Sequence, residues 1–261
     1  MRRVLALGGL VVVCAGTAGC ALPLPLRLPR REPARTLRVP ILMYHRIDVV
    51  RSTLAAITRR LTVDPRRFAA QMRWLRLHGF HAVTQLQLYR ALEEGGTLPP
   101  RPVLVTFDDG YRDVLRNAAP VLARLRMPAT AYVITDRISS RDSSFLTWQE
   151  LRVLERDGIA IGSHTVHHLE LTKLSDREAL LELRGSRALL ERRLGHPVQW
   201  LSYPEGAYDA RVVRLARRAG YVLAVTTRPG TLQDARAPLE LRRFEVLDST
   251  GVAGVAALVR G

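Results

Sequence analysis

The sequence has 261 residues, of which 40 are lysine or arginine and 24 are aspartate or glutamate, so the net charge is +16 and the isoelectric point is near 11.2. Such a charge is typical of nucleic-acid-binding proteins, but Lys173 is the only lysine and the arginines are dispersed, without a stripe of stacking aromatic residues. Because the N-terminus also carries an export signal, we expect attraction to an anionic cell envelope or membrane surface and no nucleic-acid partner.

The N-terminal segment has the features of a secretory signal peptide. A positive start, Met1–Arg3, precedes an apolar run, Val4–Ala18, that is short for a membrane span. The run ends in a sequence that resembles a bacterial lipoprotein processing site, with Cys20 as the lipidated residue. We therefore expect residues 1–19 to be a signal peptide and the exported protein to be attached by lipid to the cell envelope. Thr17 stands where that pattern prefers leucine, so plain secretion or an uncleaved anchor stays open.

Residues 20–38 are rich in proline and arginine, which predicts an extended tether. This tether either contacts an anionic membrane surface or is a solvated linker. The other cysteine, Cys14, lies in the signal, so the mature domain, residues 39–261, has no disulfide. A domain of this length is large enough for one complete core.

Strand and helix signals alternate along residues 39–261. Capping boxes mark helix starts at Thr84, Thr147 and Ser175, and Asp64-Pro65 marks another. The expected strands are Val39–Tyr44, Phe80–Val83, Val103–Phe107, Ala129–Ile134, Ile159–Ile161, Val198–Tyr203, Tyr221–Val225 and Phe244–Leu247. The alternation predicts an α/β fold, a parallel sheet with helical crossovers in a single distorted or incomplete (β/α) barrel.

Two adjacent carboxylates, Asp108 and Asp109, follow the apolar run Val103–Phe107 and precede Gly110. Alone, an Asp-Asp-Gly sequence is best explained as a turn with a helix cap. A second segment changes this interpretation, because it would open onto the same edge of the sheet.

That segment contains His164, His167 and His168, directly after the strand-like run Gly158–Ile161. Histidines at positions i and i+4 can present two imidazole nitrogens to one ion. One carboxylate and two imidazoles make three metal ligands and leave positions free for water and substrate, as in catalytic sites. The i,i+3 spacing of His167 also permits ligation.

These motifs, Thr106–Gly110 followed by His164-x-x-x-His168, resemble those of the NodB-homology polysaccharide deacetylases of carbohydrate esterase family 4, from about Val39 to about Val246. The resemblance implies a NodB-type barrel, Asp108 as the catalytic base, and a divalent metal held by Asp109, His164 and His168. It favours His168 over His167. Zinc is the expected metal, with cobalt, nickel or iron also compatible.

The segment Val39–Ile47 is similar to the opening strand of the branch that includes exported poly-N-acetylglucosamine deacetylases. In that branch the acid histidine comes from this early segment, which implies that His45 is the general acid. The late histidine that many family members carry has no counterpart in this chain. For a lone histidine, a hydrogen-bonded core position would be the ordinary interpretation.

A third segment, Tyr203-Pro204-Glu205, corresponds to a wall of the family's groove, where a backbone N–H after the proline helps to bind the oxyanion. The chain departs from the family here. Ser202 stands at the position of an arginine that pairs with the catalytic aspartate, and Glu205 stands at an aromatic position. We expect Arg242 or Arg243 to replace the arginine, from position alone, and the backbone donor at Glu205 to survive.

The resemblance implies a hydrolase that removes acetyl groups from an N-acetylated amino-sugar polymer, either peptidoglycan or an exopolysaccharide such as poly-N-acetylglucosamine, and releases acetate. Two alternatives stay open. One is a catalytically weak or inactive carbohydrate-binding lipoprotein, because of the changes at Ser202 and Glu205. The other is an esterase of O-acetylated glycans. No feature of the sequence indicates an oligomeric state.

Overall fold

The computed structural model describes residues 36–261, which belong to one compact unit. The expected signal peptide, Cys20 and most of the expected tether lie outside the described residues. The last residues of the expected tether, Thr36–Arg38, form strand β1, which pairs antiparallel with β11 (Leu232–Asp234).

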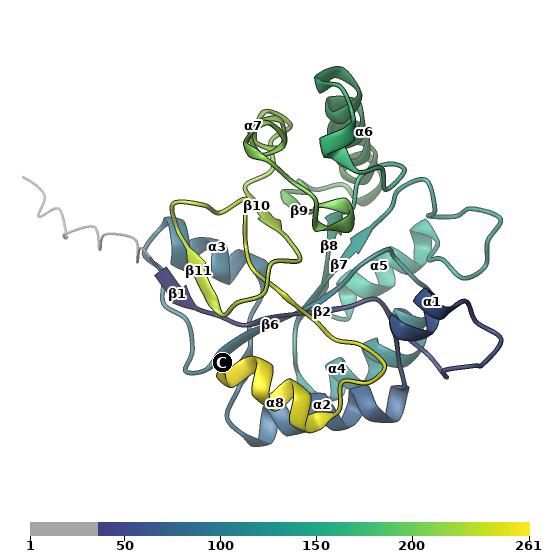
Figure 1. Ribbon diagram of the computed structural model, residues 1–261, viewed down its shortest axis with the longest axis vertical. Helices are drawn as coiled ribbons and strands as arrows, with labels where there is room; N and C mark the ends of the chain where they lie inside the picture. The colour runs from purple at the N-terminus through teal and green to yellow at the C-terminus, as the bar shows by residue number, and fades with distance from the viewer. Residues whose placement is uncertain (1–35) are drawn as a thin grey trace, which may run out of the picture. The chain divides into compact units, whose positions relative to one another are not determined.

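A sheet of eight parallel strands forms the centre of the domain (Figure 1). Its order is β10-β9-β8-β7-β6-β2-β12, and β5 pairs with the beginning of β6. The strands are β2 (Ile41–Tyr44), β5 (His81–Ala82), β6 (Pro102–Phe107), β7 (Ala129–Val133), β8 (Ile159–Ser163), β9 (Trp200–Ser202), β10 (Leu223–Val225) and β12 (Phe244–Glu245). A separate short pair is β3 (Arg46–Ile47) with β4 (Thr62–Val63).

The two edges of this sheet approach each other. Val225 of β10 forms a parallel bridge with Leu241, and the N–H of Thr226 donates to the carbonyl of Leu241 at 2.9 Å. Since the segment after Leu241 continues into β12, the sheet curls toward closure. The expected fold, a distorted (β/α) barrel of the NodB type, is confirmed.

Helices connect the strands and cover the outside of the sheet (Figure 1). They are α1 (Ala56–Arg60), α2 (Pro65–Leu77), α3 (Gln85–Glu93), α4 (Ala119–Leu125), α5 (Trp148–Arg156), α6 (Asp176–Leu194), α7 (Ala210–Arg218) and α8 (Val252–Arg260), with a π-helical segment at Val114–Ala118 and 3₁₀ turns at Leu171–Lys173 and Pro204–Gly206. Helix α2 packs against α4 and α8, and α6 against α7. The three expected capping boxes are present, and the Asp64 carboxylate caps α2.

Alternation along the strands separates a helix-facing core from the barrel interior. Leu42 and Val105 belong to the large cluster that the helices cover, whereas their neighbours Ile41 and Leu104 cluster with Tyr132. Asp108 is four residues after Leu104 and lies on the same face of the sheet, so its side chain lies at the open end of the barrel interior, which we call the mouth. The carboxyl ends of β2, β6, β8 and β9 open at this mouth.

Expected and observed strands differ mainly at their ends. The expected strand Val198–Tyr203 shortens to β9, because Tyr203 and Pro204 already enter a 3₁₀ turn. The expected strand Phe80–Val83 shortens to β5, which pairs only with the first two residues of β6. Among the described helices, none combines the length and the apolar character needed to cross a membrane.

Candidate active site

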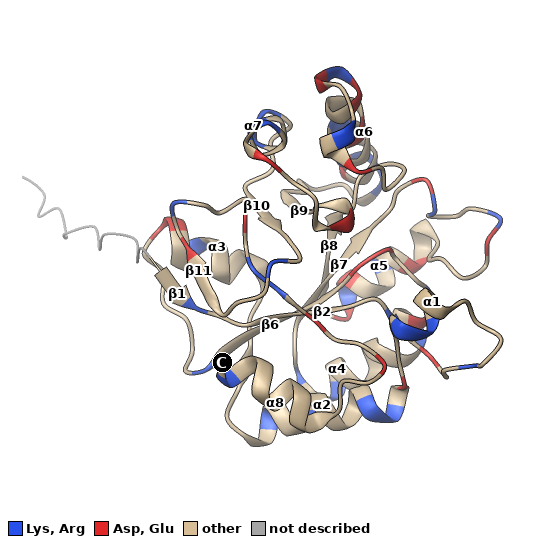
Figure 2. Cartoon of the chain, viewed as in Figure 1, with Lys and Arg blue, Asp and Glu red and all other residues tan. Residues whose placement is uncertain are grey.

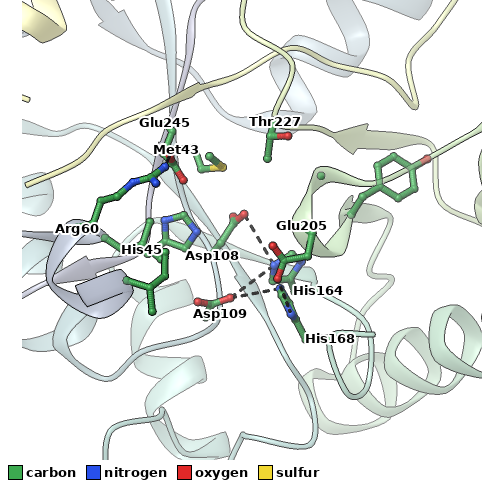
Figure 3. A pocket seen from close by; sticks show the side chains of 14 residues that line it. Met43, His45, Arg60, Asp108, Asp109, His164, His168, Glu205, Thr227 and Glu245 are labelled. Atoms are coloured by element: carbon green, nitrogen blue, oxygen red, sulfur yellow. Dashed lines mark hydrogen bonds and ion pairs between the residues drawn. The ribbon is translucent and has the colours of Figure 1, made fainter. Parts of the chain in front are cut away.

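A cavity of about 360 Å³ lies at the carboxyl ends of the strands (Figure 3). It brings together the side chains that the motifs indicated. His45 follows β2, Asp108 and Asp109 follow β6, His164 and His168 follow β8, and Glu205 follows β9. Segments up to 160 residues apart in sequence therefore share one pocket because their parallel strands end at one edge.

Asp109, His164 and His168 form the group that could hold a metal ion. One ligand atom from each of these residues lies within 4.8 Å of the others. Asp109 Oδ1 is 3.6 Å from His164 Nε2 and 3.8 Å from His168 Nε2. A carboxylate and two imidazoles are a donor set that suits zinc and other first-row divalent ions, so the residues fit the implied metal.

The hydrogen bonds of His164 leave its second nitrogen free for a ligand. Nδ1–H donates to the carbonyl of Ser202 at 2.8 Å, which directs Nε2 toward Asp109. Burial lowers the pKa of His164 to about 3, against the opposing effect of Asp108. His164 is therefore neutral, as a metal ligand must be, and its approach to Asp109 is not an ion pair.

Asp109 lies in an electrostatically unfavourable position. Burial, with the nearby carboxylates of Asp108 and Glu205, raises the pKa of Asp109 to about 7. Its backbone is left-handed, with φ of 73°, a conformation that aspartate tolerates better than most residues. A cation between Asp109 and the two histidines would offset this repulsion.

His167 does not belong to this group. Its Nδ1 lies 2.6 Å from Glu182 Oε1, and its backbone N–H donates to Glu182 Oε2 at 2.9 Å. The N–H of Val166 donates to the same oxygen at 3.0 Å. Glu182 thus holds the loop between His164 and His168, and His167 points to this carboxylate instead of the cavity.

Asp108 is paired with an arginine from the far end of the chain. Arg243 Nη1 and Nη2 donate to the two carboxylate oxygens at 2.8 and 2.7 Å, and Ser202 Oγ donates to Oδ2 at 3.0 Å. Arg243 Nη2 also donates to Ser202 Oγ at 3.0 Å. Arg242 instead donates to the carbonyl of Pro229 at 3.3 Å. Of the two arginines considered, Arg243 alone contacts Asp108.

The pair is buried, with Asp108 2% and Arg243 1% exposed. Burial alone would raise the pKa of Asp108, but Arg243, followed by His164, holds that pKa well below its usual range. Thr226 O and Thr106 Oγ1 accept the remaining guanidinium contacts at 2.9 and 3.2 Å. Asp108 is therefore an ionised carboxylate in a fixed orientation.

His45 lines the same cavity and lies beside Asp108 (Figure 3). Its Nδ1 is buried and has no hydrogen-bond partner among the described residues. Burial lowers the pKa of His45, while Asp108 and Glu245 act in the opposite direction. The ring therefore lines a cavity and its buried Nδ1 makes no hydrogen bond to the described residues, so the ordinary interpretation of a lone histidine, a hydrogen-bonded core position, does not describe it.

The segment after β9 forms a tight turn. The N–H groups of Gly206 and Ala207 donate to the carbonyls of Tyr203 and Pro204 at 2.9 and 3.0 Å. The N–H of Glu205 has no acceptor among the described residues, and the backbone of Glu205 is left-handed, with φ of 56°. The Tyr203 ring stacks on Tyr208, and burial raises the pKa of Tyr203. The turn therefore offers one free backbone donor beside the cavity.

The sequence analysis missed two charged residues of this pocket. Arg60 of α1 and Glu245 of β12 form an ion pair of 3.1 Å that borders the cavity near His45 (Figure 3). They are 185 residues apart, and neither belongs to a motif. Ser202 appeared only as a departure from the family, although its hydroxyl contacts both Asp108 and Arg243.

Sequence comparisons connect this site to known proteins. A family model described as polysaccharide deacetylase matches residues 95–224. A putative polysaccharide deacetylase, YxkH, of Bacillus subtilis is 33% identical over 84% of this chain and 74% of its own length. A poly-beta-1,6-N-acetyl-D-glucosamine N-deacetylase of Staphylococcus aureus is 24% identical over 62% of this chain and 60% of its own length.

A solved structure has the same fold. The Streptococcus pyogenes deacetylase PplD, in complex with acetate, has a TM-score of 0.78 and 27% identity over 85% of this chain. The match accounts for 98% of that solved chain. Residues 36–261 of this chain likewise form one compact unit with its own buried core.

Proposed function

The chain belongs to the polysaccharide deacetylase family, and we propose that it is a metal-dependent hydrolase that removes N-acetyl groups from an amino-sugar polymer and releases acetate. The observation that carries this proposal is the position of Asp108. An ionised, arginine-held carboxylate lies directly beside a ligand set of one carboxylate and two imidazoles, in one open cavity. A base next to a cation site is the arrangement that activates water for attack on an acyl group.

Asp109, His164 and His168 would hold a divalent ion, which would polarise the acetamide carbonyl and lower the pKa of a water molecule. Asp108 accepts the proton of the attacking water. The ion pair with Arg243 lowers the pKa of Asp108, and the same two hydrogen bonds fix the orientation of both carboxylate oxygens. The N–H of Glu205 stabilises the oxyanion from the opposite side of the pocket.

His45 completes the reaction by donating a proton to the leaving amine nitrogen. Burial, together with Arg243 and His168, lowers the pKa of His45, and the Asp108 and Glu245 carboxylates oppose this by favouring the protonated form. Acid and base therefore come from different strands, β2 and β6, on the same edge of the sheet.

The contact between Arg243 and Asp108 also bears on the alternative of an inactive binding protein. That alternative was motivated by Ser202 in place of an arginine, by Glu205 in place of an aromatic residue and by the missing late histidine. Arg243 supplies a guanidinium to the same carboxylate, and Ser202 Oγ bonds to both partners. The small serine side chain leaves room for the arginine from the other edge of the barrel, so the departure at this position is compatible with catalysis.

Acetate release tests the proposal. The domain comprising residues 36–261 would be incubated with N-acetylglucosamine oligosaccharides in β-1,4 and β-1,6 linkage, with peptidoglycan and with O-acetylated xylan, each with added Zn²⁺ or with a chelator. We expect metal-dependent release from an N-acetylated glycan. Release from xylan alone would identify an O-acetyl esterase, and no release from any substrate by the metal-loaded domain would favour the binding protein.

We further propose that the chain is exported and is attached to the envelope through Cys20. The support is the sequence of residues 1–20 alone. Globomycin-sensitive labelling of the full chain with a fatty acid, lost in Cys20→Ser, is the expected result. Labelling that persists in Cys20→Ser would exclude this attachment.

A further inference from the structure

A second cavity, of about 610 Å³, lies at the other end of the barrel. We call it the arginine pocket, because Arg38, Arg101 and Arg260 line it together with apolar walls that include Phe80 and Val259. Arg38 and Arg101 precede β2 and β6, whereas His45 and Asp108 follow these strands. The six residues of β6 separate the two ends by about 20 Å, at about 3.3 Å per residue.

Two of the three guanidinium groups, those of Arg101 and Arg260, have no carboxylate partner among the described residues. Arg38 donates to Thr231 Oγ1 at 3.3 Å and to the terminal oxygen of Gly261, the last residue of the chain.

The other two guanidinium groups are held by uncharged partners. Arg101 Nη1 donates to the carbonyl of His78 at 2.8 Å, and Arg260 lies over the Trp74 ring, 5.2 Å from its centroid. In Figure 2 the ribbon is blue at the end of β1 and at the end of α8, near the chain terminus. Arg101 and Arg260 therefore present uncompensated positive charge at the pocket.

Such a pocket has the chemistry of a phosphate site. Planar guanidinium groups match phosphate oxygens in pairs, and they are more weakly hydrated than ammonium groups. We propose that the arginine pocket binds the phosphate of anionic lipid headgroups and thereby docks this end of the domain on a membrane surface. This inference does not depend on the reaction proposed above.

Two observations favour a lipid over a soluble phosphate polymer. First, the described chain begins at Thr36, two residues before Arg38, so the tether that follows the proposed lipidation site, Cys20, is joined to this end of the barrel.

Second, Leu77 is 82% exposed, next to His78, which stacks on Trp74 with 4.0 Å between ring centroids. An exposed leucine beside a partly buried tryptophan and arginine side chains is typical of surfaces that contact the membrane interface.

Docking at this end gives the molecule an orientation. The active-site cavity then opens about 20 Å from the arginine pocket, on the side away from the bilayer. Glycan outside the membrane would reach the site without passing between the domain and the lipid.

Vesicle sedimentation tests this proposal. The probe is vesicles of phosphatidylcholine, with or without about 30% phosphatidylglycerol, mixed with the domain of residues 36–261, which lacks the preceding arginines. The test variant is Arg38→Gln/Arg101→Gln/Arg260→Gln. The control variant, Arg177→Gln/Arg192→Gln/Arg214→Gln, removes the same charge from exposed arginines of α6 and α7 that have no side-chain partner. Thermal melting verifies that both variants fold.

We expect binding to the anionic vesicles only, weakened at least about tenfold in the pocket variant, since each basic residue near such a surface contributes about fivefold and the variant removes three of them. The control variant should bind within about twofold of the parent. Equal losses in the two variants would overturn the proposal, because net charge alone would then explain binding. Pocket-dependent binding to soluble polyphosphate without binding to vesicles would overturn the assignment to lipid.

Discussion

Arg243 and Asp108, 135 residues apart, form a bidentate ion pair in the interior of the barrel, with N–O distances of 2.8 and 2.7 Å. Removing one partner of a buried pair leaves an uncompensated charge. We expect Arg243→Gln to lower the free energy of unfolding by about 3–5 kcal/mol and to lower kcat/KM for acetate release at least about 100-fold. Arg242→Gln is the matched control, since Arg242 contacts a backbone carbonyl instead. Unchanged turnover in Arg243→Gln would show that the pair has no role in catalysis.

His45→Gln tests the assignment of the general acid. Because His45 is outside the group of possible metal ligands, the variant should bind metal as the parent does. We expect kcat to fall by about 10²–10⁴. His81→Gln is the control, because His81 contacts only the carbonyl of Pro100 outside the cavity. Full activity in His45→Gln would remove His45 from the mechanism.

Two adjacent histidines provide a direct test of the metal site. His168→Gln removes a proposed ligand, and His167→Gln removes a side chain that contacts Glu182. Zinc titration should show that His168→Gln weakens binding by more than the 10–100-fold that loss of a supporting hydrogen bond costs. The affinity of His167→Gln should stay within about threefold of the parent. The reverse order would transfer the ligand role to His167.

The turn at Glu205 depends on a glycine. A Cβ at Gly206, where φ is 67°, would lie 2.1 Å from Thr227 Oγ1, so Gly206→Ala must displace the turn. Complete loss of an oxyanion donor lowers kcat by about 10²–10³-fold. Because Gly206→Ala displaces the donor without removing it, we expect kcat to fall by at least about tenfold. Glu205→Gln keeps the backbone donor and should retain turnover within about threefold. Gly251→Ala is a control glycine substitution with no atom within 4 Å of the new Cβ.

Much of the fold could be predicted from the sequence, because its signals are local. The apolar run before Asp108 and the capping boxes at Thr84, Thr147 and Ser175 each describe one element, and the structure contains all of them. Parallel strands then bring Asp109, His164 and His168 to one edge, which the spacing of the motifs already indicated.

The choice between Arg242 and Arg243 could not be made in this way. Side chains along β12 alternate between the two faces of the sheet. Its first residue, Phe244, packs against the helix-facing core, so the preceding residue, Arg243, faces the barrel interior. The ion pair of Arg60 and Glu245 could not be predicted either, because it joins a helix and a strand from distant parts of the sequence. Such contacts follow from the closure of the barrel and not from any local pattern.

Acetate release by the parent domain and by Asp108→Asn, at equal and verified zinc occupancy, tests the central claim most directly. The substitution keeps the shape of the side chain but removes the proton acceptor. We expect both proteins to bind one zinc ion and Asp108→Asn to release acetate at least about 100-fold more slowly. Equal rates at equal occupancy would contradict the assignment of Asp108 as the base and, with it, the mechanism proposed for this site.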